Sequence, residues 1–246
     1  MGINIAYMMD ASYEYKYSTI AHELGHLFGF SDDDFMHFSN DNGNDPVIYV
    51  QMANGKHYRR FLNTPAARRV AEKHFGPGVP GIEIERQGGG GTALHHLEKR
   101  AFMNDFMSPG AGIEDIVYSE FVLAALEDGG WYDIDYSYVS PAVWGKDQGL
   151  DFFDKPCIEY AYVNGIRVFT TPFREFCTES TGPGNTCSFN RLNKATCNYA
   201  EDLRIWRREY RYFANNYRKG GIDSNADYCP YRKENPVERG ECRASE

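Results

Sequence analysis

Two histidines four residues apart, with a glutamate beside the first, form the segment His22-Glu23-Leu24-Gly25-His26. Positions i and i+4 of an α-helix lie on one face, so the two imidazoles can bind the same metal ion. Glu23 lies one position further round the helix and can reach a water molecule on that ion. Imidazole ligands beside a carboxylate suit a zinc site that activates water. The segment therefore predicts a hydrolytic zinc site with Glu23 as the general base.

A catalytic zinc ion also needs a third protein ligand and an open fourth position. Asp32, six residues after His26, is one candidate. A downstream glutamate is disfavoured, because none occurs between Glu23 and Glu72. The other candidates are the remaining histidines, His37, His57, His74, His95 and His96. Spacing alone leaves the third ligand open.

The elements that must position these residues can be sketched from local patterns. A helix is predicted from Ser18, as its N-cap, to Phe28, ending at Gly29. Its apolar residues Ile20, Leu24 and Leu27, together with Phe28, predict that it faces a core. Residues 3–9 predict a short strand, and residues 31–57, rich in Asp, Asn and Gly, predict a loop.

Further along the chain, helices are predicted at 65–75 and 114–127. The stretch 76–91 is rich in glycine and predicts tight turns, but no Gly-Lys-Ser/Thr follows to suggest a phosphate site. Asn164-Gly165 predicts a hairpin that joins strands at 158–163 and 166–169. The acidic run 32–34 lacks the twelve-residue EF-hand pattern and is predicted to be a solvent-exposed turn.

Composition divides the chain near residue 150. All seven histidines precede this point, and all six cysteines follow it. Cysteines so clustered, without a Cys-x-x-Cys pair, predict three disulfides and an oxidising compartment. The formal net charge of −9 and the lack of a basic patch exclude a nucleic-acid partner, and no apolar run is long enough to span a membrane.

Several segments in combination resemble the leishmanolysin family of zinc metallopeptidases. The resemblance extends from about Gly2 to Phe153, and more loosely through the cysteine-rich tail. The matching segments are 22–30, 88–92, 96–100 and 107–109, with shorter matches at 127–132, 144–145, 148–149 and 151–152.

The resemblance implies specific roles for individual residues. His96, which precedes Leu-Glu-Lys-Arg, would be the third zinc ligand after His22 and His26, in place of His95. Met107 would be the methionine of the Met-turn, which packs beneath the zinc ion, although an ordinary core methionine fits the same position. One zinc ion, with Glu23 as general base, would support an endopeptidase acting on protein or peptide substrates.

The resemblance also implies an α+β, metzincin-like fold. Residues 1–150 would form the catalytic region, with the active-site helix, a long insert, the third ligand and the Met-turn, and residues 151–246 a disulfide-rich, strand-containing C-terminal region. Only 21 residues precede His22, so most of the family's N-terminal sheet subdomain is expected to be lacking. Leu150 stands where the family usually has a cysteine, so one disulfide of the family pattern would be absent or rewired.

An extracellular or cell-surface location is expected from the cysteines and the resemblance, although no signal peptide is recognisable. The main alternative function is a non-catalytic surface adhesion or binding module, or an inactive fragment, with a structural zinc site. The intact Glu23 favours the peptidase, because a structural site gains nothing from a general base. The sequence does not predict an oligomeric state.

Overall fold

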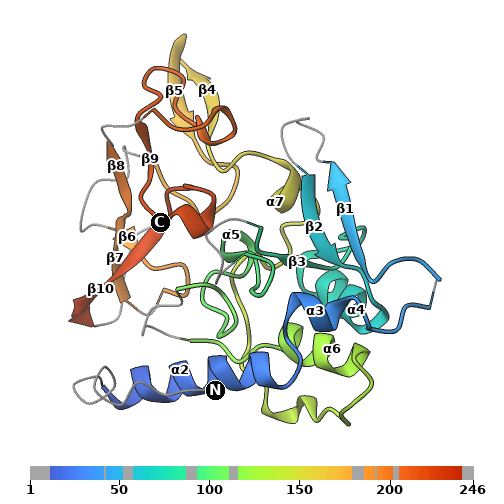
Figure 1. The fold of residues 1–246 in the computed structure, drawn as a ribbon. Helices are drawn as coiled ribbons and strands as arrows, with labels where there is room; N and C mark the ends of the chain where they lie inside the picture. The colour runs from blue at the N-terminus through green and yellow to red at the C-terminus, as the bar shows by residue number, and fades with distance from the viewer. Residues whose placement is uncertain are drawn as a thin grey trace.

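The chain adopts a mixed α+β fold of short helices and small antiparallel sheets, as predicted (Figure 1). The computed structural model describes residues 12–41, 43–51, 58–86, 93–110, 116–178, 186–191, 193–201 and 205–239, with side chains up to Lys233. The strand predicted at residues 3–9 lies outside this range.

Helix α2 (Tyr13–Leu27) carries the His-Glu-x-x-His segment. It begins earlier than predicted, because Ser12 rather than Ser18 is the N-cap and accepts a hydrogen bond from the backbone N–H of Tyr15. The Ser18 hydroxyl instead donates to the carbonyl of Tyr15 within the helix. The end of the helix agrees with the prediction, since Gly29 follows with a φ of 109° that favours glycine.

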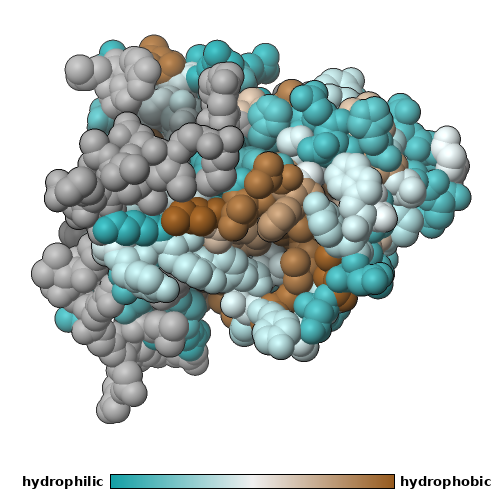
Figure 2. All heavy atoms as spheres, turned by 60° about the horizontal axis from the view of Figure 1, so that its bottom comes forward, coloured by the Kyte–Doolittle hydropathy of each residue, from teal (hydrophilic) through white to brown (hydrophobic). Residues whose placement is uncertain are grey.

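The prediction that this helix faces a core is wrong. Gly25 is its only buried residue, and its exposed apolar side chains include Ile20 and Leu27. Figure 2 turns this side of the molecule forward and shows a band of apolar atoms there. The helix therefore touches the rest of the protein mainly through the turn around Gly25 and its two histidines.

A three-stranded antiparallel sheet lies beside the helices. It comprises β1 (Val47–Gln51), β2 (Tyr58–Leu62) and β3 (Ile82–Ile84), in the order β1-β2-β3. The loop predicted for 31–57 is therefore wrong at β1 and at α3 (Asp32–Phe35). The short run at 47–50 is rich in β-branched residues, but Asp, Asn and Gly residues surround it in the sequence. It forms a strand because β2 pairs with it.

Two helices cover this part of the core. Helix α4 (Pro65–Phe75) has the predicted bounds. Helix α6 (Glu120–Asp128) is shorter than the predicted 114–127, because Ser119 caps its N-terminus. Residues 116–119 are extended here, with Val117 bridged to Asp105, and residues 111–115 are outside the described range.

The C-terminal part is built from hairpins and short segments. The predicted hairpin is confirmed as β4 (Glu159–Val163) and β5 (Ile166–Thr170), with Asn164 and Gly165 at φ values of 51° and 77°. The remaining strands are β6 (Thr186–Cys187), β7 (Asn193–Cys197), β8 (Tyr199–Glu201), β9 (Lys219–Gly221) and β10 (Arg232–Arg239). The short helices are α5 (Lys99–Phe102), α7 (Asp151–Asp154), η1 (Tyr136–Tyr138), η3 (Arg208–Tyr210) and η4 (Ser224–Ala226).

Disulfides connect the C-terminal segments. Cys157 pairs with Cys229 and Cys177 with Cys197; Cys187 is also disulfide-bonded, and no described cysteine is free. The buried apolar core is continuous across residue 150, as Phe75 packs against both Phe152 and Phe153. The division into two regions at this residue stays a prediction. Among the described helices, none has the length and apolar character that a membrane span requires.

Candidate metal centre

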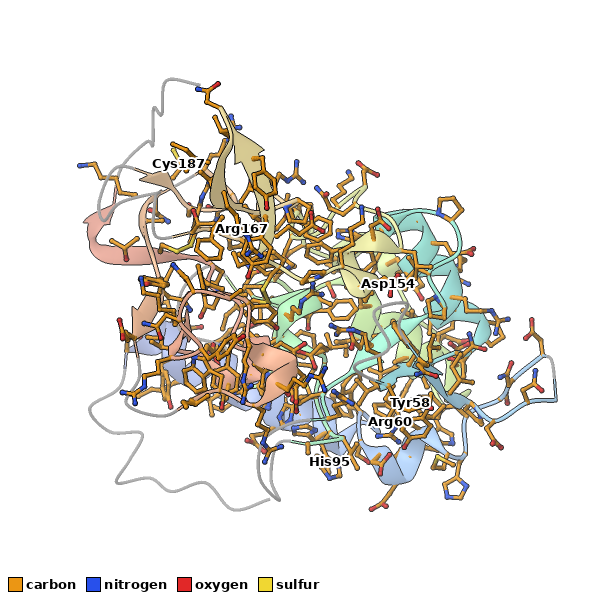
Figure 3. All side chains as sticks on the ribbon, turned by 90° about the horizontal axis from the view of Figure 1, so that it is seen from above. Tyr58, Arg60, His95, Asp154, Arg167 and Cys187 are labelled. Atoms are coloured by element: carbon orange, nitrogen blue, oxygen red, sulfur yellow. A yellow bond between two sulfur atoms is a disulfide. The ribbon has the colours of Figure 1, made fainter. Side chains whose placement is uncertain are left out.

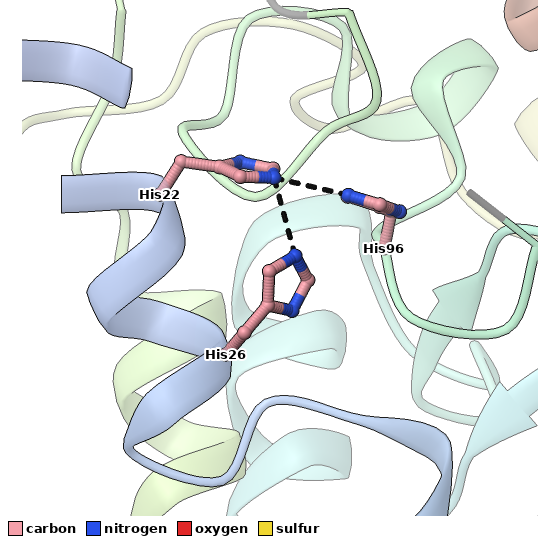
Figure 4. Close-up of side chains that lie close together, drawn as sticks. All are labelled: His22, His26 and His96. Carbon is pink, nitrogen blue, oxygen red and sulfur yellow. Dashed lines mark hydrogen bonds between the residues drawn. The ribbon is translucent and has the colours of Figure 1, made fainter. Parts of the chain in front are cut away.

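Three histidines from distant parts of the chain meet at one point (Figure 4). His22 and His26 come from successive turns of α2, and His96 comes from the segment before α5. The Nε2 atom of His22 lies 3.0 Å from that of His96 and 3.2 Å from that of His26. Among the described residues, this is the only group of three or more potential ligands close enough to hold one metal ion.

Backbone carbonyls fix two of the three rings. The Nδ1 atom of His22 lies 2.6 Å from the carbonyl oxygen of Phe106, and Nδ1 of His26 lies 2.8 Å from that of Phe30. A carbonyl oxygen only accepts hydrogen bonds, so each Nδ1 must carry the proton. Each Nε2 of a neutral ring then presents a lone pair to the shared centre, in the arrangement usual for zinc-binding histidines.

This donor set fits a zinc ion. Unprotonated ring nitrogens so close together repel one another unless a proton or a cation lies between them. Burial lowers the pKa of His26, which favours the neutral, metal-binding form of that ring. Three imidazoles with a fourth position open are one of the ligand sets of catalytic zinc sites.

His96 is placed by the sheet. Its carbonyl oxygen accepts the N–H of Glu85 (2.8 Å), and Leu97 forms a bridge with Ile84. The segment around His96 thus extends the sheet beyond β3. A histidine 74 positions away from His22 in sequence reaches the same centre through this pairing.

Met107 lies against α2 at Gly25, between His22 and His26 in the sequence. A methyl group added at Gly25 would overlap its Sδ atom and lie 3.2 Å from its Cε atom. Met107 is fully buried, and its carbonyl oxygen accepts the N–H of Leu97 (3.0 Å), next to His96. The assignment of Met107 to a Met-turn beneath a metal ion stays a prediction.

Glu23 is exposed on α2, directly after His22. Helical geometry keeps its side chain off the line that joins His22 to His26, so it does not compete with them as a ligand. A carboxylate beside the centre but outside the ligand set can accept a proton from water. The position of Glu23 is thus compatible with its predicted role as general base.

The other residues considered as the third ligand are not found in the histidine cluster. Asp32 forms an ion pair with Arg60 and donates its backbone N–H to Nδ1 of His95 (3.3 Å), so it does not join the histidine cluster; Arg60 and His95 lie close together in Figure 3. His74 is buried beside the carbonyl of Trp144 (2.8 Å). His37 is exposed, and His57 lies outside the described residues.

Two contributors to the site were missed by sequence reasoning, the carbonyls of Phe106 and Phe30, and so was the buried carboxylate of Asp105 two residues before Met107. Backbone carbonyls carry no side-chain signal, so no residue type could reveal them. Asp105 was visible in the sequence but has no ligand spacing to single it out.

Comparison with known proteins identifies the family of the chain. The sequence profile described as Leishmanolysin matches residues 1–245, and the chain therefore belongs to the leishmanolysin family, a family of zinc metallopeptidases. It is 30% identical over 270 residues to the leishmanolysin-like peptidase of Caenorhabditis elegans (90% of this chain, 40% of the relative). It is also 30% identical over 279 residues to that of Drosophila melanogaster (93% and 40%).

The family is also represented among trypanosomatids. Leishmanolysin of Leishmania tropica is 28% identical over 215 residues, which cover 86% of this chain and 30% of that protein. The chain spans about 40% of the length of the animal relatives.

Proposed function

We propose that this chain carries the catalytic region of a zinc-dependent endopeptidase. The observation that carries the proposal is the convergence of three Nε2 atoms from His22, His26 and His96, two of them oriented by backbone carbonyls. Membership of a metallopeptidase family supports the same function. Protein or peptide substrates and a metzincin-like arrangement of the site are part of this proposal.

In the proposed mechanism, the three histidines hold the metal and Glu23 moves the proton. When bound, zinc would polarise the peptide carbonyl and lower the pKa of a water molecule. A carboxylate oxygen of Glu23 accepts the proton of that water as it attacks and then passes it to the leaving amine nitrogen. The N–H groups at Nδ1 of His22 and His26 stay on their carbonyl acceptors and keep the rings in place.

The disulfides indicate the compartment in which the protein folds. At least five cysteines are oxidised, which requires an oxidising compartment during folding. An extracellular or cell-surface location follows as part of the proposal.

The first test separates metal binding from proton transfer. We expect Glu23→Gln to keep stoichiometric zinc and to lower kcat on a quenched peptide about 10²–10⁴-fold, because only the general base is lost. His96→Ala should lose both zinc and activity, because two histidines on one helix do not complete the site. Zinc content is measured by elemental analysis, and hydrolysis by fluorescence.

His37→Ala, which alters an exposed histidine outside the cluster, is the matched control and should behave as wild type. Full activity in Glu23→Gln would refute the mechanism. Zinc-dependent folding of the wild-type chain without any peptide cleavage would instead identify a binding module.

A further inference from the structure

A buried carboxylate near the metal centre has no role in the mechanism above. Asp105 lies in the turn after α5 and is only 3% exposed. Its Oδ1 atom accepts the N–H of Met107 at 2.9 Å, and its Oδ2 atom contacts the hydroxyl of Ser119. Burying a carboxylate is unfavourable, and burial raises the pKa of Asp105 to about 7. A carboxyl group that is buried at this cost in free energy is expected to have a structural or functional role.

The hydrogen bonds around Asp105 have a defined direction. The Ser119 hydroxyl caps α6 by accepting the N–H of Phe121 (3.2 Å), so its own proton is free to point toward Asp105. The N–H of Met107 can only donate. Oδ1 of Asp105 therefore accepts in either protonation state, and Oδ2 accepts from the Ser119 hydroxyl when the carboxyl group is ionised.

Through these bonds Asp105 connects two segments. Its own carbonyl accepts the N–H of Ser108 (2.9 Å), which closes the turn 105–108. The N–H of Phe106 donates to the carbonyl of Val117 (3.0 Å), and the N–H of Val117 to that of Asn104 (2.9 Å). The carboxylate thus ties the turn to the strand-like segment that leads into α6.

This turn contacts the metal centre from two directions. The Phe106 carbonyl lies 2.6 Å from Nδ1 of His22. The Met107 carbonyl accepts the N–H of Leu97 (3.0 Å), the residue after His96. A shift of the turn would break the hydrogen bond between Nδ1 of His22 and the Phe106 carbonyl, which fixes the tautomer of His22. It would also loosen the His96 segment.

We propose that Asp105 is a positioning residue of the metal centre, whose carboxylate holds the 105–108 turn so that the Phe106 carbonyl orients His22. Asp105 touches neither ligand nor substrate and acts through Phe106 and Met107. Its effect on turnover rests on the proposed function, but the orientation of the His22 ring is measurable without turnover.

The test compares Asp105→Ala and Asp105→Asn with a matched control, Asp128→Asn, in the full chain. Asp128 is also a buried carboxylate (9% exposed), but it caps α4 by accepting the N–H groups of Ala66 and Ala67 at 2.9 Å each. The His22 tautomer is read in the zinc-free chain by long-range ¹H–¹⁵N NMR. Zinc affinity is measured by chelator competition, and the ligand field from the absorption spectrum of the Co²⁺-substituted protein.

In wild type, His22 should be the Nδ1–H tautomer. In Asp105→Ala we expect a mixture of tautomers, an altered Co²⁺ spectrum and a zinc affinity about 10–100-fold lower, as for other residues that orient a metal ligand. Turnover should fall through kcat with KM nearly unchanged. Asp105→Asn keeps an acceptor for Met107 and should lie between Asp105→Ala and wild type, while Asp128→Asn should lower the melting temperature only.

A wild-type tautomer and wild-type zinc affinity in Asp105→Ala would overturn the proposal, and so would equal losses in Asp128→Asn. If Asp105→Ala does not fold, Ser119→Ala removes the hydroxyl contact to Asp105, and its His22 tautomer and zinc affinity decide in the same way. If the wild-type chain binds zinc but cleaves no peptide, the proposed function fails, and the tautomer and affinity measurements still decide the role of Asp105.

Discussion

The lack of a side-chain methyl group at Gly25 allows Met107 to lie against α2 at the turn that joins His22 to His26. Gly25 is the only buried residue of α2, and the space beside its Cα atom is filled by the Met107 side chain. Glycine at this helical position cannot be explained by backbone conformation, since its φ is not positive. The close approach of Met107 is the physical reason for it.

The sign of the effect of Gly25→Ala tests this explanation. Alanine in a helix interior is normally more stable than glycine by about 1 kcal/mol. Here we expect the opposite, a lower melting temperature and weaker zinc binding, because the new methyl group overlaps Met107 Sδ. Thermal unfolding and chelator competition measure the two effects.

The double variant Gly25→Ala, Met107→Ala provides the control. Removing the overlapping side chain should make the alanine at position 25 favourable again, so the two substitutions should be strongly non-additive. If Gly25→Ala alone stabilises the protein, the overlap is relieved by a small movement of Met107 and the explanation is wrong.

At the scale of elements, α4 and α6 pack together through an aromatic group that includes a histidine. His74 of α4 is buried, its Nε2 atom lies 2.8 Å from the Trp144 carbonyl, and its ring contacts Phe75 and Phe121. Burial lowers the pKa of His74 below 6.5. The folded protein therefore favours the neutral ring.

A pH dependence of stability follows from this shift. Below pH 6.5 the unfolded chain binds a proton at His74 before the folded protein does, so the contribution of His74 to the free energy of unfolding falls as the pH decreases. The raised pKa of Asp105 acts in the opposite direction, but it does so in wild type and in His74→Gln alike. We therefore expect His74→Gln, which stays neutral and still donates to Trp144, to gain stability relative to wild type as the pH falls from 7.5 to 5.5, measured as the difference between their urea midpoints.

Both proteins are measured with a chelator present, so that zinc release does not contribute. His37→Gln, at an exposed site, is the control and should keep the wild-type slope. An unchanged slope in His74→Gln would show that the ring is charged or solvated in the folded state.

Elements with a strong local signal were predictable, and those stabilised by distant partners were not. Helix α4, with Pro65 in its first turn, and the Asn164-Gly165 hairpin follow from local rules. Strand β1 depends on β2, and the exposure of the apolar residues of α2 does not follow from their helical spacing. Likewise His22 and His26 were predictable from helical spacing, whereas the choice of His96 needed a family resemblance, because its position depends on pairing with Glu85.

At the scale of the whole molecule, the C-terminal part is joined to the sheet by buried charges. Arg59 of β2 pairs with Glu83 of β3 (2.6 Å) and with Asp227 after η4 (3.3 Å). Lys99 of α5 pairs with Asp223 (2.8 Å). Since α5 begins three residues after His96, the tail contributes to the surroundings of the third histidine.

The two described disulfides should differ in their contribution to stability. Cys157–Cys229 spans 72 residues and Cys177–Cys197 spans 20. From loop-closure entropy we expect losses of about 4 and about 3 kcal/mol when each pair is replaced by alanines. Denaturant unfolding of the two double variants measures this difference.

Because Cys229 lies two residues from Asp227, loss of the longer disulfide should also weaken zinc binding, whereas the shorter pair serves as the control. Equal zinc affinity in both variants would show that the tail does not support the site.

The pairing of the His96 segment with β3 has a kinetic consequence. His22 and His96 are 74 positions apart in sequence, and Arg59 and Asp227 are 168 apart. Contacts between such distant residues form slowly, because the entropy cost of closing the loop arises before the contact stabilises the chain. The three histidines are therefore expected to come together only late in folding. An ion bound by all three of them, as proposed above, would do little to speed folding and would act mainly by slowing unfolding, so it would prolong the lifetime of the folded protein.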